Sequence, residues 1–512
     1  VLPGGDPTDH LVLDRVGFPL LVKASAGGGG RGMRLVAEAD ELDDAIEAAS
    51  REALSSFADG TVFVERWLTA PRHIEVQVMG DTHGTIVSLG DRECSIQRRH
   101  QKVIEEAPAP GVTDSTRQAM AEAAVAGARA LGYVSAGTFE FLVDGDDFFF
   151  LEMNTRLQVE HPVTECVTGL DLVRLQLEVA DGARLDAGGV AITGHALEGR
   201  LYAEDPSAGY LPSPGTIYRW RTGPTPGVRY DSGVEDGTDV PAAYDPLLAK
   251  VIVHAPSRGE ASARLARALR ELQVHGVRTN RDLLVGVLAD EDWLAGRTTT
   301  DFLDRHPGLA APERDLRLHA AAAALAGATA RRRSAPALAF APSGWRNLRS
   351  AGQHVVLEGG QGPVEVTYSF GPGPSVSVTV DGEPIDGRLL TSANDEVDWV
   401  VDGIRRRVAV HWVGDRVWIN DAEGQSEWRE LPRFAEHSGA SASGGPTAPL
   451  PGTVVAVEVE AGQAVSAGQV LVVLEAMKME HRIVAPADAT VAEVRVIAGD
   501  TVDVGQVLVV LG

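Results

Sequence analysis

The stretch Glu475-Ala476-Met477-Lys478-Met479-Glu480 lies between two copies of an internal repeat, and this repeat decides the fold of the C-terminal region. When residues 452–475 are aligned with residues 489–512, about 14 of roughly 24 positions are identical, which marks a duplication. Both copies alternate apolar and polar residues and contain Gly-Gln turns, the pattern of short strands joined by tight turns. Two such halves predict a small all-β sandwich with Lys478 on the connection between them, where a side chain is presented with little obstruction.

The residues beside Lys478 indicate more than a surface lysine. An exposed turn seldom carries two apolar side chains such as Met477 and Met479 without a reason, although an ordinary exposed lysine is the alternative. The sequence Glu-Ala-Met-Lys-Met resembles the biotinyl domain of biotin-dependent carboxylases rather than the related lipoyl domains. This resemblance implies that Lys478 carries biotin covalently and that a biotin protein ligase attaches it.

The composition of the chain limits its class and its partners. Its 512 residues are 44% hydrophobic and 23% charged, which is ordinary for several globular domains. No apolar run approaches the length that spans a membrane, and a net charge of −26 argues against a nucleic-acid partner. Cys94 and Cys166 lie far apart in the sequence, which fits a reducing compartment better than a disulfide framework. We therefore expect a cytoplasmic protein with no membrane or nucleic-acid partner.

Shifts in composition divide the chain. Residues 438–447 are rich in Gly, Ser and Ala, which predicts a flexible linker that isolates residues 448–512 as a mobile module. Residues 313–437 contain an Ala-rich helix and then short alternating runs, which predicts an antiparallel β-domain with a preceding helix. In residues 1–312 strands alternate with helical stretches, which indicates an α/β or α+β catalytic unit.

A glycine-rich segment follows the apolar run 20–24. Residues 27–32 read Gly-Gly-Gly-Gly-Arg-Gly, and glycines let backbone amides approach phosphate oxygens closely. Lys23 precedes the glycines, and the residues after them favour a strand over a helix, so this is not a Walker P-loop. We expect a flap over a nucleotide, with Lys23 neutralising phosphate; the alternative is a flexible hairpin tip.

Two acidic residues occur in a predicted β-hairpin around the turn at residues 144–147. If the loop is the three residues 145–147, Glu140 lies directly opposite Glu152 on one face, and a divalent cation would relieve their repulsion. A two-residue loop would place the two carboxylates on opposite faces, so this interpretation depends on the register.

Two further stretches supply polar groups. Beyond Glu152, every second residue is polar, as a phosphate and metal site requires, although a solvent-washed edge strand is the alternative. Residues 94–106 gather basic groups that could form an anion pocket for a small substrate or could be a solvated charge run. The polar face consists of Asn154, Arg156, Gln158 and Glu160, and the basic groups are Arg98, Arg99, His100 and Lys102.

The order and spacing of four segments, 23–33, 72–77, 98–110 and 152–165, resemble biotin carboxylase, an ATP-grasp ligase. The whole chain resembles the α subunit of a biotin-dependent acyl-CoA carboxylase of the propionyl-, methylcrotonyl- or acetyl-CoA type. This resemblance implies a multidomain α+β protein with an ATP-grasp fold, then an antiparallel β-domain with a preceding helix, then an all-β biotinyl/lipoyl-type sandwich. The implied domains are 1–65 (ATP-grasp lid), 66–312 (ATP-grasp and C-terminal carboxylase subdomain), 313–437 (helix and β-barrel-like subunit-contact domain), 438–447 (linker) and 448–512 (biotinyl domain).

The same resemblance implies roles for individual residues. Glu160 would be the general base that deprotonates bicarbonate, and Arg200 would stabilise the negative oxygen of deprotonated biotin. Bicarbonate would be bound by Lys102, Arg156, Gln158 and Val159, and Mg²⁺ or Mn²⁺ by Glu140, Glu152 and Asn154. ATP would be bound by Lys23, Gly27, Gly28, Gly29, Gly30, Glu65, Leu68, His73, Gln97 and His100.

The resemblance also implies partners and an alternative function. A carboxyltransferase β subunit would receive the carboxyl group, in a hetero-oligomer, and would determine which acyl-CoA is used. Biotin carboxylases have a Rossmann-like first domain with one more ATP-contacting lysine, and Val1 would fall in the linker after it. The alternative is therefore a biotinylated carrier or scaffold subunit with an incomplete ligase site. Pyruvate carboxylase is disfavoured because no segment is long enough for its transferase barrel.

Overall fold

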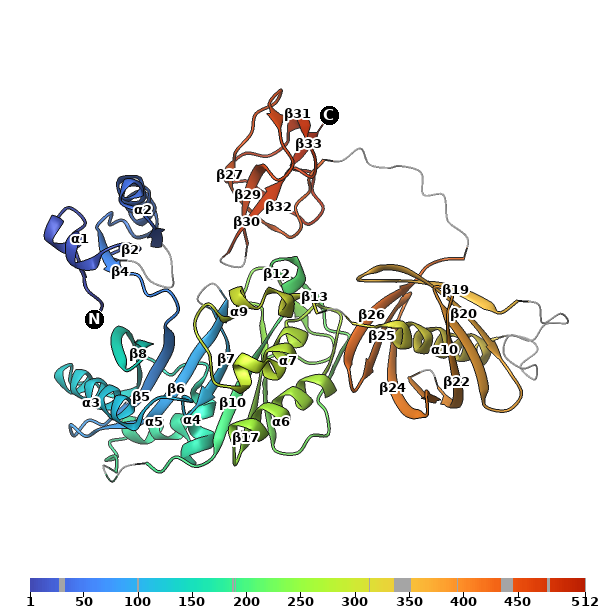
Figure 1. The fold of residues 1–512 in the computed structure, drawn as a ribbon, viewed down its shortest axis with the longest axis horizontal. Helices are drawn as coiled ribbons and strands as arrows, with labels where there is room; N and C mark the ends of the chain where they lie inside the picture. Colours follow the sequence, from blue (N-terminus) through green and yellow to red (C-terminus); the bar gives the residue numbers. More distant parts are fainter. Residues whose placement is uncertain are drawn as a thin grey trace.

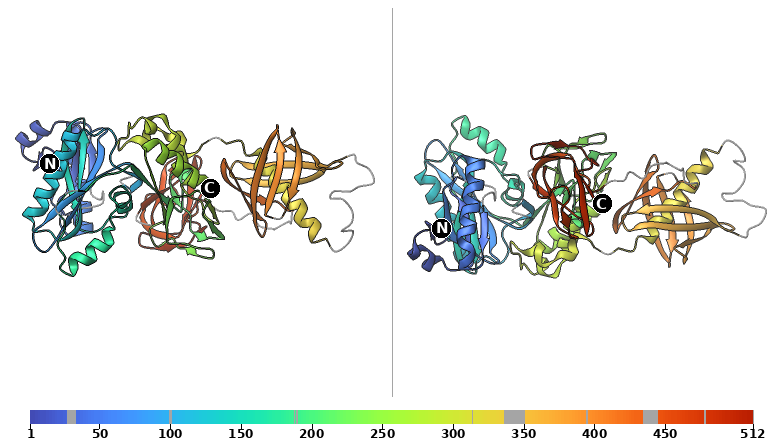
Figure 2. Two further views of the ribbon diagram at one scale, coloured as in Figure 1. Left: turned by 90° about the horizontal axis from the view of Figure 1, so that it is seen from below. Right: turned by 90° about the horizontal axis from the view of Figure 1, so that it is seen from above.

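The computed structural model describes residues 1–26, 33–98, 101–186, 188, 190–312, 314–335, 351–393, 395–433, 445–476 and 479–511. The described parts form an elongated molecule, with the N-terminal sheet at one end and a barrel at the other (Figures 1 and 2). No helix among these residues is long and apolar enough to cross a membrane.

A small antiparallel sheet with the strand order β1-β4-β2-β3 forms the N-terminal region. β2 pairs with β3 on the other side of residues 27–32, so a strand follows the glycine-rich segment, as the sequence predicted. Leu20, Val22 and Val64 are fully buried beneath α2 in the core of this unit. The elements are β1 (Gly4–Gly5), α1 (His10–Val16), β2 (Leu20–Ala24), β3 (Met33–Val36), η1 (Ala39–Glu41), α2 (Leu42–Phe57) and β4 (Val62–Arg66).

A large antiparallel sheet with the order β15-β17-β10-β7-β6-β5-β8-β9 forms the centre of the molecule (Figure 1). Helices α6 and α7 cover one face of β10. A Cβ on Gly199 would contact Leu265 of α6 and Leu284 of α7. Side chains alternate along a strand, so the neighbours of Gly199 face the other side, where α4 packs on β10. The strands are β5 (Arg72–Gly80), β6 (Ile86–Arg98), β7 (Gln101–Ala107), β8 (Ser135–Asp144), β9 (Asp147–Asn154), β10 (His195–Tyr202), β15 (Val228–Ser232) and β17 (Leu247–Ala255).

Helices and short strands complete this central part. α3 packs on β5 and β6, and α5 packs on β8. The helices are α3 (Asp114–Ala130), α4 (His161–Thr168), α5 (Leu172–Ala180), η2 (Pro206–Ala208), α6 (Arg258–Glu271), α7 (Arg281–Ala289), α8 (Glu291–Leu294), α9 (Phe302–Arg305) and η3 (Pro307–Ala310). The short strands are β11 (Glu204–Asp205), β12 (Leu211–Pro212), β13 (Gly215–Thr216), β14 (Arg219–Arg221), β16 (Asp239–Val240) and β18 (Gln273–His275).

The β8–β9 hairpin places Glu140 directly opposite Glu152. Asp144 pairs with Asp147, so the loop has two residues, which is the alternative that the sequence analysis expected to place the two carboxylates on opposite faces. The register then shifts between Glu140 and Phe141, which leaves Leu151 as the extra residue of a β-bulge. This extra residue reverses the alternation of side chains and returns both carboxylates to one face.

The described strands between residues 353 and 430 form a closed antiparallel barrel around a helix. The sequence predicted a helix that precedes a β-domain, and the structure places this helix, α10 (Arg317–Arg333), inside the barrel (Figure 1). Its residues from His319 to Ala328 are all buried, and most of them are alanines, whose small side chains let the surrounding strands approach the helix closely. The strands are β19 (Gln353–Gly359), β20 (Gly362–Phe370), β21 (Ser375–Val380), β22 (Glu383–Ser392), β23 (Glu396–Val401), β24 (Ile404–Val413), β25 (Arg416–Asp421) and β26 (Gly424–Glu430).

The barrel packs against the central part through a joint that includes several neutral polar groups. The side-chain amide of Gln425 hydrogen-bonds both the N–H (3.2 Å) and the C=O (2.7 Å) of Val274 in β18. His275 Nε2 donates to Asn420 Oδ1 at 2.7 Å, and its ring stacks on Trp418. Because Nε2 of His275 carries the proton, Nδ1 accepts from His411 Nδ1 at 2.8 Å, which requires the His275 ring to be neutral.

The C-terminal sandwich confirms the fold that the repeat predicted. Its sheets have the orders β30-β29-β27-β32 and β28-β31-β33 and enclose Val454, Leu471, Leu474, Val491 and Leu508. Ala476 pairs with Met479, so residues 477 and 478 connect β29 to β30. The strands are β27 (Gly452–Val457), β28 (Ala464–Val465), β29 (Val470–Ala476), β30 (Met479–Val484), β31 (Ala489–Val494), β32 (Thr501–Val502) and β33 (Val509–Leu511).

Candidate functional site

Lys102 is the centre of a cluster of buried charges on the face of the large sheet that α4 covers. Its Nζ donates to Glu75 Oε2 at 2.6 Å, to Glu160 Oε1 at 2.6 Å and to Glu140 Oε1 at 3.0 Å. The three carboxylates come from β5, from the N-cap of α4 and from β8, so one ammonium group joins three elements. Buried charges are stable only when they are paired in this way.

Arg92, which the sequence analysis did not identify, lies beneath this cluster. Its side chain is fully buried and forms an ion pair with Glu75. The guanidinium also donates to the side-chain oxygens of Gln77 (2.8 Å), Thr164 (2.9 Å), Gln158 (3.1 Å) and Thr138 (3.3 Å). It therefore connects three strands to α4 and fixes Gln158.

The three predicted metal ligands lie together. Asn154 Nδ2 donates to Glu140 Oε1 at 3.0 Å and to Glu152 Oε1 at 3.3 Å. Glu140 is buried, whereas Glu152 is exposed, so the group opens from the sheet toward solvent. Carboxylate and amide oxygens are the ligands that Mg²⁺ prefers, and Glu152 adds an exposed carboxylate beside Glu140. The donor set therefore fits a divalent metal, which would be held by Glu140, Glu152 and Asn154.

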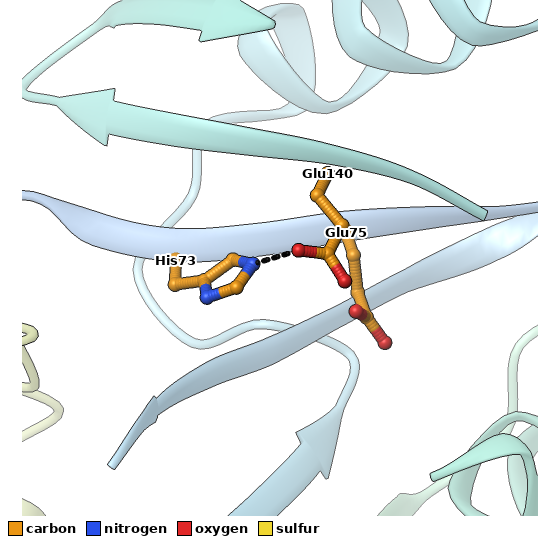
Figure 3. Close-up of side chains that lie close together, drawn as sticks. All are labelled: His73, Glu75 and Glu140. Carbon is orange, nitrogen blue, oxygen red and sulfur yellow. Dashed lines mark hydrogen bonds and ion pairs between the residues drawn. The ribbon is translucent and has the colours of Figure 1, made fainter. Parts of the chain in front are cut away.

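His73, Glu75 and Glu140 form a second group whose ligand atoms lie within 4.8 Å of one another (Figure 3). His73 Nε2 donates to Glu140 Oε2 at 2.8 Å, the bond drawn in Figure 3. Lys102 already contacts both carboxylates, and Arg92 also pairs with Glu75. Their negative charge is thus compensated, and we interpret His73 as the group that orients Glu140.

The charged surroundings keep Glu140 and Glu160 ionised. Burial alone raises the pKa of the Glu140 carboxyl, but the hydrogen bond and charge of His73, together with Lys102, hold this pKa far below its ordinary value. Burial also raises the pKa of the Glu160 carboxyl, but the charges of Lys102, Arg200 and Arg92 together hold this pKa far below its ordinary value. Both groups are therefore carboxylates at neutral pH.

Arg200 projects from β10 toward the same cluster. Its Nη2 donates to Glu160 Oε2 at 2.9 Å, and its Nε lies 2.5 Å from Glu105 Oε1, without the alignment of a hydrogen bond. Burial raises the pKa of the Glu105 carboxyl to about 7, although Arg200 lowers it. Glu198 lies directly opposite Glu105 on the neighbouring strand, and burial raises its pKa well above the ordinary value. One face of β7 and β10 thus carries the predicted catalytic arginine and two acidic groups that the sequence analysis missed.

The remaining predicted bicarbonate residues adjoin Glu160. Gln158 Nε2 donates to Glu140 Oε1 at 2.9 Å, so this side chain joins the acidic group to the segment before α4. Arg156 is exposed and its Nη2 donates to Asn154 Oδ1 at 3.3 Å. The Val159 carbonyl accepts from Lys250 Nζ at 2.8 Å. The segment from residue 154 to residue 160 is thus tied to the charged cluster along its length.

The predicted nucleotide-binding residues lie on two different sheets. Lys23 and Glu65 belong to β2 and β4 of the small sheet and pair at 2.9 Å, and Leu68 follows β4 and is half-buried. Gln97 lies on β6 of the large sheet and pairs with Lys102 across β6 and β7. The two sheets are connected through the segment between β4 and β5 (Figure 1). Gly27, Gly28, Gly29, Gly30, His100 and Lys478 lie outside the described residues.

Four family models match successive parts of the chain. Residues 8–188 match the carbamoyl-phosphate synthase L chain ATP-binding domain, and residues 198–305 match the biotin carboxylase C-terminal domain. Residues 315–433 match the BT domain of the methylcrotonyl-CoA carboxylase alpha subunit, and residues 447–511 match the model described as biotin-requiring enzyme.

Two carboxylase alpha subunits are similar to this chain over most of their length. The chain is 40% identical to the propionyl-CoA carboxylase alpha chain of Ruegeria pomeroyi, over 92% of this chain and 74% of that one. It is 36% identical to the mitochondrial methylcrotonoyl-CoA carboxylase subunit alpha of Rattus norvegicus, over 94% of this chain and 71% of the other.

Solved structures agree with this assignment. The biotin carboxylase domain of Hydrogenobacter thermophilus 2-oxoglutarate carboxylase, with MgADP and bicarbonate, is 40% identical with a TM-score of 0.59, covering 61% of this chain and 71% of that one. Biotin carboxylase from Campylobacter jejuni is 42% identical with a TM-score of 0.57, covering 60% and 70%. The chain belongs to the family of biotin-dependent acyl-CoA carboxylase alpha subunits. The predicted order of ATP-grasp fold, helix-containing β-domain and biotinyl sandwich is confirmed, and with it a ligase class that uses ATP, biotin and Mg²⁺.

Proposed function

We propose that this chain uses ATP and bicarbonate to carboxylate biotin held on Lys478 and presents the product to a separate carboxyltransferase β subunit. The observation that carries this proposal is the Lys102 cluster, in which Glu160 lies between Lys102 (2.6 Å) and Arg200 (2.9 Å). Two fixed cations and one carboxylate suit a small anion that must lose a proton.

The charge on Glu160 is compatible with its role as a general base. A carboxylate paired with two cations is a weak base, because both cations favour its ionised form. When bicarbonate enters, its own negative charge would engage Lys102 and Arg200 and would raise the pKa of Glu160 toward the range in which it can accept a proton. Substrate binding would therefore activate the base at the moment it is needed.

The other site residues would orient the reactants. Arg156, Gln158 and Val159 would complete the bicarbonate pocket, and Arg200 would stabilise the negative oxygen of deprotonated biotin. Bound Mg²⁺ would neutralise charge on the phosphates, with Glu140, Glu152 and Asn154 holding it. The nucleotide would contact the residues expected from the sequence: Lys23, Gly27, Gly28, Gly29, Gly30, Glu65, Leu68, His73, Gln97 and His100.

Each domain of the chain has a role in this function. We assign residues 1–65 to the ATP-grasp lid, 66–312 to the remainder of the carboxylase unit, 313–437 to contact with the β subunit, and 438–447 to the linker. Residues 448–512 would be modified by a biotin protein ligase and would carry biotin between the two active sites in a hetero-oligomer. The cytoplasmic location expected from the cysteine content stays a prediction.

Two measurements on the 512-residue chain test the proposal. Purified chain should hydrolyse ATP only when bicarbonate is present, and free biotin should increase the rate. Lys478→Ala should abolish avidin labelling while ATP binding, measured by calorimetry, stays unchanged. Avidin labelling without bicarbonate-dependent ATP hydrolysis would instead favour a carrier or scaffold subunit, and continued labelling of Lys478→Ala would show that biotin is attached elsewhere.

A further inference from the structure

Lys250 lies on β17, beside the strand that carries Arg200. The proposed reaction assigns no role to this lysine. It is directly opposite Arg200 in the pairing of β10 with β17. Its Nζ donates to the Val159 carbonyl at 2.8 Å and lies 3.3 Å from Asp231 Oδ2 on β15. The side chain is only 13% exposed, so these contacts form in a largely dry environment where they are strong.

The Val159 carbonyl belongs to the peptide that joins Val159 to Glu160. A peptide unit is planar, so a hydrogen bond that fixes this carbonyl fixes the plane from which the Glu160 backbone leaves. Glu160 is also the N-cap of α4, where the chain turns into the helix, and its carboxylate must reach both Lys102 and Arg200. The bond from Lys250 therefore acts on the residue that the proposed mechanism uses as its base.

The charges around Lys250 favour a cation at this position. Asp231 pairs with Lys250, and the charge of Lys250 also favours the ionised form of the fully buried Glu198, whose carboxylate oxygens have no hydrogen-bond partner. Arg229 pairs with Asp231 at 2.8 Å and with Glu165 of α4 at 2.8 Å. Two adjacent strands thus hold α4 at two points, its start through Lys250 and its middle through Arg229.

This network connects two family domains. Lys250, Asp231 and Arg229 belong to the part that matches the biotin carboxylase C-terminal domain, whereas Val159, Glu160 and Glu165 belong to the ATP-binding part. We propose that Lys250 is a positioning residue that holds the Val159–Glu160 peptide, so that the Glu160 carboxylate stays between Lys102 and Arg200. The inference rests on the proposed function only in taking Glu160 to act on bicarbonate.

The first test measures the position of the segment without requiring activity. Lys250→Met keeps the length of the side chain but removes the charge and the donor, and Lys250→Arg keeps both. Hydrogen exchange of the amides of His161 and Val163, which bond to the carbonyls of Gln158 and Glu160, should become about tenfold faster in Lys250→Met, as expected for loss of one hydrogen bond from a charged donor. Lys250→Arg and the surface control Arg267→Met should exchange like the wild type.

The second test measures catalysis. Lys250→Met should raise the KM for bicarbonate about tenfold while the KM for ATP stays within twofold, and Lys250→Arg should restore most of the difference. Unchanged exchange in Lys250→Met would overturn the inference, as would exchange that increases equally throughout the large sheet. A wild-type chain without bicarbonate-dependent ATP hydrolysis would contradict the proposed function, while the exchange measurement would still decide the role of Lys250.

Discussion

The large sheet and the barrel solve the same packing problem with opposite chemistry. Each is an antiparallel sheet with a face that must be covered. On the large sheet, the face beneath α4 is filled with charged groups, among them Arg92, Glu105 and Glu198, which are fully buried. The barrel encloses α10, whose buried residues from Ala320 to Ala326 are alanines and one leucine.

This difference indicates different roles for the large sheet and the barrel. Buried ion pairs contribute little net stability, because the loss of hydration offsets their attraction. A sheet that keeps so many of them is built for the electrostatics of a reaction. The barrel, by contrast, is stabilised by close packing of apolar groups around a helix. Three perturbations test this comparison.

The largest effect is expected from Lys102→Met. The variant leaves Glu75, Glu140 and Glu160 without their shared cation, so we expect a loss of about 3–5 kcal/mol in the free energy of unfolding. Bicarbonate-dependent ATP hydrolysis should fall by at least about 100-fold. Urea denaturation and steady-state kinetics measure the two effects. Arg51→Met, which removes an exposed pair with Glu47, should change stability by less than about 1 kcal/mol, and an equal loss in both variants would contradict the special position of Lys102.

A smaller effect is expected inside the barrel. Ala323→Leu adds three carbon atoms to a fully buried position of α10, and overpacking of this kind costs about 1–3 kcal/mol. The unfolding temperature of the barrel should fall, while bicarbonate-dependent ATP hydrolysis should not change, because α10 is remote from Lys102. Ala330→Leu, at a half-buried position near the end of the same helix, is the matched control. Equal stability of the two variants would show that the barrel interior is not closely packed at Ala323.

The smallest effect concerns the joint between the two regions. Burial lowers the pKa of His275 from its ordinary 6.5 to about 3, and the nearby charges of His411, Arg219 and Arg281 act in the same direction against its bond to Asn420. The unfolded chain therefore binds a proton at His275 more readily than the folded chain does. The free energy of unfolding does not depend on this group above about pH 6.5. It decreases as the pH falls from 6.5 toward 3, by at most about 1.4 kcal/mol per pH unit.

We therefore expect the free energy of unfolding of the wild type to decrease more steeply between pH 7 and pH 5 than that of His275→Phe. The phenylalanine preserves the stacking on Trp418 but does not titrate. Urea denaturation monitored by tryptophan fluorescence at a series of pH values measures both slopes. Parallel slopes would mean that the ring is protonated as easily in the folded state as in the unfolded state.

The sequence carried the architecture of the sandwich and the identity of most site residues, because repeats and polar alternation are local signals. The pairing of Glu140 with Glu152 could be predicted only as one of two registers. The bulge at Leu151 decides between them, and nothing about an apolar residue within an apolar strand distinguishes it as the extra one.

Arg92 shows a second reason why sequence reasoning is incomplete. The run Asp91-Arg92-Glu93 has the composition of a solvent-exposed loop, yet it lies within β6 and all three residues are buried. Arg92 pairs with Glu75 of β5, and Asp91 pairs with Arg117 of α3. Because these partners come from other elements, the sequence around Arg92 does not show that the three residues are buried. One signal was available for α10: a helix that is apolar on all sides is expected to be enclosed on all sides.

The place of α10 in the chain also has a consequence for synthesis. Because α10 precedes every strand of the barrel, the ribosome releases the interior of this domain before any part of its wall. β19 pairs with β26, so the wall is complete only once residue 430 has emerged. Until then the cover of the alanine-rich helix is incomplete, and a nascent or prematurely terminated chain that ends within the barrel exposes part of this helix to chaperones and proteases.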